Sequence, residues 1–223
     1  MTPLNIIKKY KHAWIIPVFG ILYMMGFTYL EQRNNVRFHI IHMKIDDAIP
    51  FCEYFIVPYF LWFAFIAATV FYFTFINKNK ADYYRLITTL GIGMTLFLVI
   101  SYVYPNAQDL RPVVFARDNL FVDMVKHLYR IDTPTNILPS IHVFNSVAAC
   151  TAIFKCEGLK KHRAVRGGTL VLTVLIVLAT VFLKQHTLLD VITAFALYFI
   201  CYQVIYKPRT AFQKAKAAEA AAK

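Results

Sequence analysis

His186 and Asp190, near the C-terminal end of the chain, are residue types that can transfer protons or attack phosphorus. They are four residues apart, a spacing that puts both side chains on one face of a helix, about one turn from each other. A carboxylate beside an imidazole fixes its tautomer and stabilises its cationic form. We therefore interpret His186 as a candidate nucleophile or base. The competing interpretation is a His–Asp pair that only links two helices.

A second motif, Pro139-Ser140-Ile141-His142, has the composition of a helix start. Asn136 can cap a helix, and Pro139 is tolerated in the first turn. Ser140 and the neighbouring backbone N–H groups are then predicted at a helix N-terminus, where phosphate binds readily. His142 follows about one turn into the helix and is a candidate proton donor to a leaving group. The alternative is an ordinary capped helix with a histidine at the membrane interface.

Two cations complete the candidate site. Arg111, which precedes Pro112, carries a planar guanidinium that can clamp phosphate, and a solvated arginine is the alternative interpretation. Lys184, two residues before His186, can add positive charge, or it can snorkel to the membrane interface. The four cysteines form no CxxC pair, and no cluster of metal ligands accompanies these residues. The sequence therefore predicts neither a metal nor another cofactor.

The composition indicates that membrane helices position these residues. Of the 223 residues, 59% are hydrophobic and the mean hydropathy is +0.52, which is too apolar for a soluble domain of this length. A transmembrane helix needs roughly 20 mostly apolar residues. The segments that meet or approach this requirement are 13–30, 54–76, 86–104, 137–154, 168–182 and 186–206. The predicted fold is all-α, an integral membrane bundle of six transmembrane helices.

The charges of the connecting segments give the predicted bundle a direction. The N-terminal segment, the second and fourth loops and the C-terminal tail carry net charges of +3, +2, +4 and +4, whereas the first and third loops carry −1 and 0. Because positive segments stay in the cytoplasm, both termini are predicted there, and the three motifs face outward. The same rule explains the net charge of +12 without a nucleic-acid partner. We expect a membrane domain over residues 1–210 and a solvated basic tail over 211–223.

Two histidines, an aspartate within an apolar segment and cations on one membrane face are suited to phosphoryl transfer through a phosphohistidine. The order Arg-Pro, Pro-Ser-x-His and His-x-x-x-Asp resembles the type 2 phosphatidic acid phosphatase superfamily, which shares its core with vanadium haloperoxidases. Among the branches of that superfamily, the sequence is most similar to inositol phosphorylceramide synthases and sphingomyelin synthases. The resemblance covers most of the chain, including the six spans and the inside termini.

The resemblance implies a role for each candidate residue. His186 would attack phosphorus, Asp190 would orient and activate it, and His142 would protonate the leaving alcohol. Arg111 and Ser140 would bind phosphate. Water would then hydrolyse the phosphohistidine, or a lipid alcohol would intercept it.

The sequence departs from the family pattern at four positions. Tyr104, Ala179 and Thr180 stand where the family has lysine, serine and arginine, and Ile141 stands where it has glycine. Two family cations are therefore absent. We take Lys184 as a hypothetical replacement for one of them.

These features lead us to expect a metal-independent lipid phosphate phosphatase with its site at the outer face of a membrane. The expected membrane is the bacterial cell membrane. The second hypothesis is a lipid phosphotransferase that moves a phospho-head group to a ceramide- or diacylglycerol-like alcohol. The third is a lipid-binding or lipid-translocating protein that has kept the bundle but lost catalysis. The expected partners are the bilayer and a lipid phosphate.

Overall fold

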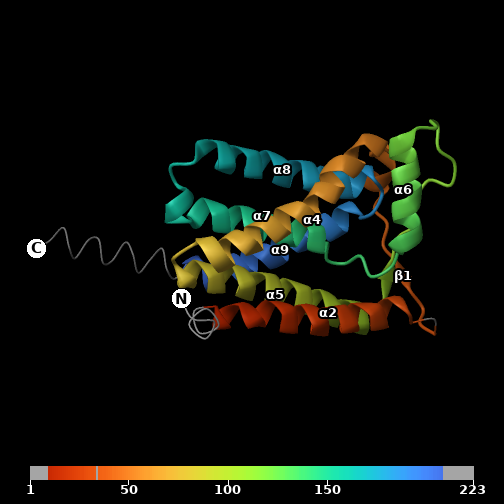
Figure 1. Cartoon of the computed structure of the whole chain (residues 1–223). Coiled ribbons are helices and arrows are strands. Elements are labelled where there is room, and N and C mark those ends of the chain that lie inside the picture. The colour runs from red at the N-terminus through yellow and green to blue at the C-terminus, as the bar shows by residue number, and fades with distance from the viewer. Residues whose placement is uncertain (1–9, 34, 208–223) are drawn as a thin grey trace, which may run out of the picture.

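The computed structural model describes residues 10–33 and 35–207, and helices make up nearly all the regular structure of this part (Figure 1). In chain order the elements are η1 (Lys11–Trp14), α2 (Ile15–Glu31), β1 (His39–Ile40), α3 (Lys44–Ala48), η2 (Glu53–Phe55), α4 (Ile56–Phe71), η3 (Tyr72–Ile76), α5 (Lys80–Val103), β2 (Asn106–Ala107), α6 (Leu120–Ile131), α7 (Ile141–Lys155), η4 (Glu157–Leu159), α8 (Arg163–Phe182) and α9 (Leu188–Ile205). The all-α prediction is confirmed for these residues. The predicted basic tail, 211–223, lies outside them.

Five helical stretches are long and apolar enough to cross a membrane. They are Lys11–Glu31, Glu53–Ile76, Lys80–Val103, Arg163–Phe182 and Leu188–Ile205. Each one overlaps a predicted span, so the length and composition of its helices mark the chain as a membrane protein. The remaining predicted segment forms α7, an apolar helix of 15 residues, which is shorter than the roughly 20 residues that a span needs.

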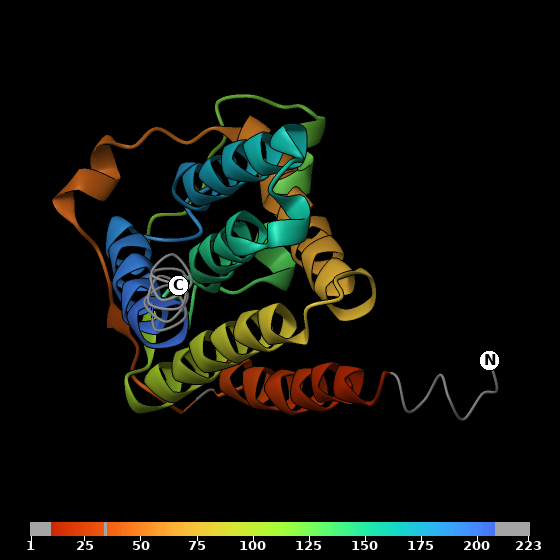
Figure 2. The same ribbon diagram turned by 90° about the vertical axis from the view of Figure 1, so that its left-hand side faces the viewer.

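The central position of α7 explains why this helix carries polar residues within an apolar sequence. Helices α4, α5, α8 and α9 surround it (Figure 2). Ala148, Ala149 and Ala152 are buried on α7, and small side chains of this kind let neighbouring helices approach closely. Asn145 and Ser146 are buried as well. Since protein rather than lipid covers this helix, it carries polar residues that a lipid-facing helix does not.

Gly93 on α5 marks the closest approach of a neighbour to α7. A Cβ atom at this position would lie 2.1 Å from Cε1 of Phe144, so neither side chain fits without movement. We expect Gly93→Ala to lower the free energy of unfolding by about 1–3 kcal/mol, the usual cost of overpacking a core. Denaturant unfolding in detergent measures the change. Gly20→Ala is the matched control, because nothing lies within 4 Å of a Cβ at Gly20, and equal stability of both variants would contradict the prediction.

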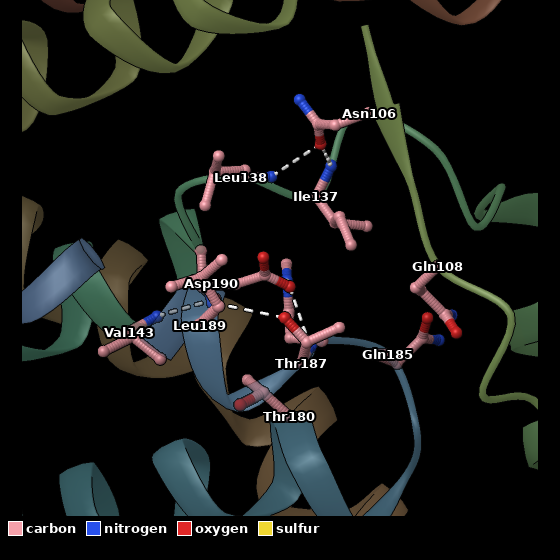
Figure 3. A network of polar contacts seen from close by, with 12 residues as sticks. Asn106, Gln108, Ile137, Leu138, Val143, Thr180, Gln185, Thr187, Leu189 and Asp190 are labelled. Atoms are coloured by element: carbon pink, nitrogen blue, oxygen red, sulfur yellow. Dashed lines mark hydrogen bonds and ion pairs between the residues drawn. The ribbon is translucent and has the colours of Figure 1, made fainter. Parts of the chain in front are cut away.

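Loops at one end of the bundle hold the segment that leads into α7. Strand β1 pairs in parallel with β2, and Ala107 forms a bridge with Thr135. The side-chain carbonyl of Asn106 accepts hydrogen bonds from the backbone N–H groups of Ile137 (2.8 Å) and Leu138 (3.0 Å) (Figure 3). These bonds fix the approach to α7 and therefore the position of its first residues.

Helix α6, which the sequence analysis does not predict, lies crosswise over this end of the bundle (Figure 1). Its buried residues Val122, Val125 and Leu128 recur every three residues, and this face packs against η2 and α4. The side chain of Asn119 caps the helix by accepting a hydrogen bond from the backbone N–H of Val122 at 3.0 Å. A short amphipathic helix of this kind gives no signal in a search for apolar spans.

Candidate active site

Asp190 holds the start of α9 and also faces His186. The helix begins at Leu188, with Thr187 as its N-cap. The backbone N–H of Thr187 donates to Oδ2 of Asp190 (2.8 Å), and the N–H of Asp190 donates back to the hydroxyl of Thr187 (3.3 Å) (Figure 3). This reciprocal pair is a capping box, which is a structural reason for an acid at this position.

The prediction that His186 and Asp190 share a helix is wrong, because His186 precedes the N-cap. Its backbone N–H donates instead to the carbonyl of Thr180 at 3.0 Å, in the turn between α8 and α9. The turn nevertheless brings Nδ1 of His186 to 3.4 Å from Oδ2 of Asp190. Asp190 is completely buried, and its Oδ1 has no hydrogen-bond partner among the described residues. A buried carboxylate beside an imidazole is the arrangement that orients a catalytic histidine.

Ser140, rather than Asn136, is the N-cap of α7. Its hydroxyl accepts a hydrogen bond from the backbone N–H of Val143 at 3.4 Å. The backbone N–H of Ser140 donates to the carbonyl of Asp190 at 3.2 Å, which ties the start of α7 to the start of α9. His142 is thus in the first turn of α7. The two motifs that sequence analysis links to chemistry therefore meet at two adjoining helix N-termini.

The imidazole of His142 faces that of His186, and their ring centroids are 5.7 Å apart. On its other sides the His142 ring contacts the rings of Tyr59 (4.7 Å) and Trp62 (4.3 Å), both from α4. Aromatic packing of this kind restricts the orientation of the imidazole. Nδ1 of His142 is buried and has no partner in the described part of the chain.

Arg111 reaches the same region, but most of its donors are bound to protein. Its guanidinium donates to the backbone carbonyls of Tyr129 (3.3 Å), Asp132 (2.7 Å) and Thr133 (3.2 Å), at the C-terminal end of α6. It also donates to Oε1 of Gln185 at 2.5 Å. Arg111 is therefore not a solvated arginine, and burial lowers the pKa of its guanidinium. Only its Nε–H lacks an acceptor within the described residues.

Lys184 points to α3 and the residues after it, in the segment that precedes α4. Its ammonium donates to the backbone carbonyls of Asp46 (2.7 Å) and Ile49 (2.6 Å). It is only 8% exposed, so it does not snorkel into the interface. Burial lowers the pKa of this ammonium. Its role as a replacement for a family cation stays a prediction, because the contacts that the structure gives it join two loops.

Several further polar residues near the histidines are not among the candidates that the sequence indicates. Asp132 accepts a hydrogen bond from the hydroxyl of Tyr59 at 3.3 Å, and burial raises the pKa of this carboxyl. Glu31, at the end of α2, accepts from the side chains of Asn136 (2.8 Å) and Thr133. Only the fold brings α2 and α4 to this place, so their sequences give no signal. Gln185 could have been found from its position next to His186.

His42, between β1 and α3, links α3 to the loop after β2. Its Nδ1 lies 2.9 Å from Asp109 and its Nε2 lies 2.8 Å from Asp47, and hydrogen bonds to these carboxylates raise the pKa of His42. The attraction between His42 and the two carboxylates is therefore at full strength below the pKa of a free histidine. It is lost as the pH rises through the raised pKa of His42. We expect Asp109→Asn to lower the pKa of His42, as measured by NMR titration. An unchanged pKa in this variant would contradict the arrangement.

Comparison with protein-family models, curated proteins and solved structures finds no match to this chain. Among the described residues, no group of three or more His, Cys, Asp or Glu side chains is placed to hold a metal ion.

Proposed function

We propose that this chain is an integral membrane enzyme that hydrolyses lipid phosphate esters through a phosphohistidine on His186. The observation that carries the proposal is the separation of 5.7 Å between the His142 and His186 rings, with the Asp190 carboxylate 3.4 Å from Nδ1 of His186. In an in-line displacement each catalytic group comes within about 3–3.5 Å of its target atom, so nucleophile and acid lie roughly 6–7 Å apart. Ring centroids 5.7 Å apart bring both imidazoles within reach of one bound phosphoryl group.

In the first step, Asp190 keeps the proton of His186 on Nδ1, which leaves the lone pair on Nε2 free to attack phosphorus. A nitrogen–phosphorus bond forms, and the phosphorus–oxygen bond to the lipid alcohol breaks. His142, protonated at the start, gives its proton to the leaving oxygen. Charge on the phosphoryl oxygens is stabilised by hydrogen-bond donors at the start of α7 and by the guanidinium of Arg111.

In the second step, neutral His142 takes a proton from water, and the resulting hydroxide attacks the phosphorus. The nitrogen–phosphorus bond breaks, inorganic phosphate leaves, and His186 and protonated His142 are restored. Both steps use the protein's own imidazoles as nucleophile, acid and base. Activity is therefore expected to persist in EDTA.

The proposal includes a membrane arrangement in which α7 crosses the membrane in addition to the five longer helices. Both termini then lie in the cytoplasm. The support for this arrangement is the charge of the loops: Lys160 and Lys161 lie between α7 and α8, Arg163 and Arg166 lie in the first turn of α8, and the segments near the histidines are neutral or acidic. The catalytic histidines would then face outward. We propose the cell membrane of a bacterium as the location.

Transfer to a lipid alcohol is the second candidate function. The observation that favours it is burial, since His186 is 7% exposed and Asp190 is completely buried. A phosphohistidine formed there is sheltered from bulk water, and an alcohol that binds beside it competes well with hydrolysis. The chemistry of the first step is unchanged, and only the acceptor differs.

Purified protein in detergent with EDTA tests both functions. Phosphate release is measured on phosphatidate, polyprenyl pyrophosphate and sphingoid phosphates, each with and without an added lipid alcohol. Release to water supports the phosphatase, and appearance of phosphate only on the alcohol supports the transferase. If folded protein turns over none of these substrates, the proposed function is wrong and the lipid-binding hypothesis takes its place.

A further inference from the structure

Gln185 is joined to Arg111 in a way that defines the orientation of its amide. Nη2 of Arg111 donates to Oε1 of Gln185 at 2.5 Å. A guanidinium has donors only, so the amide atom that faces it is the oxygen, and the NH2 group is at the other end. Gln185 is 2% exposed and immediately precedes His186. The free end of a buried amide thus belongs to the residue that directly precedes the candidate nucleophile in the chain.

The Arg111–Gln185 pair has donors that no protein group accepts. Nε2 of Gln185 and Nε of Arg111 are both buried without a hydrogen-bond partner in the part of the chain that the structure describes. Nearly all buried polar groups in folded proteins are paired, and a buried donor without an acceptor is costly. The pair therefore calls for an acceptor that comes from outside the protein.

Neighbouring side chains of similar type do not share this feature. Gln108 donates to the carbonyl of Lys184 at 2.9 Å and accepts from the backbone N–H of Leu110 at 2.5 Å, so both ends of its amide are bound. Lys184 itself donates to two backbone carbonyls. Other buried donors among the described residues also lack a partner, for example Nε1 of Trp62 beside His142, but of Gln108, Lys184, Gln185 and Arg111 only the last two have a buried donor atom without a partner.

We propose that Nε2 of Gln185 and Nε of Arg111 together donate hydrogen bonds to the phosphoryl oxygens of the substrate. The inference rests on the proposed function, in which His186 attacks that phosphorus. Phosphoryl transfer is accelerated mainly by donors that stabilise the equatorial oxygens in the transition state. Gln185 thereby supplies, with a neutral amide, part of what the cations missing at Tyr104 and Thr180 supply in the family that the sequence resembles.

Gln185→Glu keeps the hydrogen-bond acceptor of this side chain and removes its donor. The carboxylate still accepts from Arg111, but it has no N–H to offer and it repels phosphate. We expect kcat/KM to fall by about 100-fold or more, in the range seen when one oxyanion donor is removed, and the inhibition constant of orthovanadate to rise in parallel. Gln32→Glu is the matched control, because Gln32 is exposed at the end of α2 and the variant adds the same charge. This control is expected to stay within twofold of the wild type.

The outcomes distinguish the inference from the function on which it rests. Wild-type turnover together with unchanged kcat/KM and vanadate inhibition in Gln185→Glu would overturn the inference and leave the phosphatase intact. Absence of turnover and of vanadate binding in folded wild-type protein would overturn both. If Gln185→Glu does not fold, Gln185→Met removes the same donors without a charge. A loss of about tenfold or more is then expected, and wild-type activity in this variant would refute the role of Gln185.

Discussion

Replacing His186 by alanine is expected to reduce phosphate release from a lipid phosphate by on the order of 10³-fold or more, to the background of the assay. Its imidazole supplies the nitrogen that bonds to phosphorus, and it contacts both the carboxylate of Asp190 (3.4 Å) and the ring of His142 (centroids 5.7 Å apart). Release of phosphate in detergent with EDTA measures the effect. Thermal unfolding of the same sample shows whether the variant is folded.

Two further variants make the loss at His186 interpretable. His127→Ala removes an exposed histidine on α6 and is expected to leave activity unchanged. Asp190→Asn keeps an oxygen that accepts the capping bond from Thr187 but removes the charge next to His186, so activity is expected to fall while α9 keeps its start. If His186→Ala retains most of the activity while folded, His186 is not the nucleophile.

Replacing His142 by glutamine is expected to slow hydrolysis of an alkyl phosphate ester by about 10²–10⁴-fold, the usual contribution of general acid–base catalysis. An alkoxide is a poor leaving group and needs the proton that His142 supplies. The comparison substrate is an aryl phosphate, whose leaving group departs without a proton. With the aryl phosphate, the first step in His142→Gln should be nearly as fast as in the wild type. The phosphohistidine should then accumulate, because no base is present to activate the water that hydrolyses it.

The dependence on the leaving group separates an acid from a packing residue. His142 also packs against Tyr59 and Trp62, so its replacement disturbs a wall of the site. A purely structural defect lowers the rates of alkyl and aryl esters by the same factor. Equal losses for both substrates would therefore remove His142 from the role of acid, whereas a selective loss with the alkyl ester supports it.

The apolar spans and the candidate catalytic residues could be predicted from the sequence because each depends on local features. Hydrophobic length identifies a span whatever its neighbours are, and five helices follow that rule. His142 lies in the first turn of α7 and His186 in the turn before α9, and their ring centroids are 5.7 Å apart. α7 departs from the rule in length because surrounding helices, rather than lipid, cover it.

Contacts that join distant segments could not be read from the sequence. Lys184 has the charge of a phosphate ligand, but the fold puts the carbonyls of Asp46 and Ile49 around its ammonium. Arg111 likewise meets the end of α6, a helix with no hydropathy signal. His186 lies outside α9 because Thr187 and Asp190 together cap that helix, and reciprocal capping is decided by backbone geometry as well as by residue type.

The measurement that tests the central claim most directly is capture of the intermediate. Wild-type protein is mixed with a ³²P-labelled lipid phosphate, quenched in alkali and digested, and the labelled peptide is identified by mass spectrometry. The proposed mechanism predicts an acid-labile label on His186 that is absent from His186→Ala and increased in His142→Gln with an aryl phosphate. Turnover with no label on His186, or a label on another residue, would contradict it.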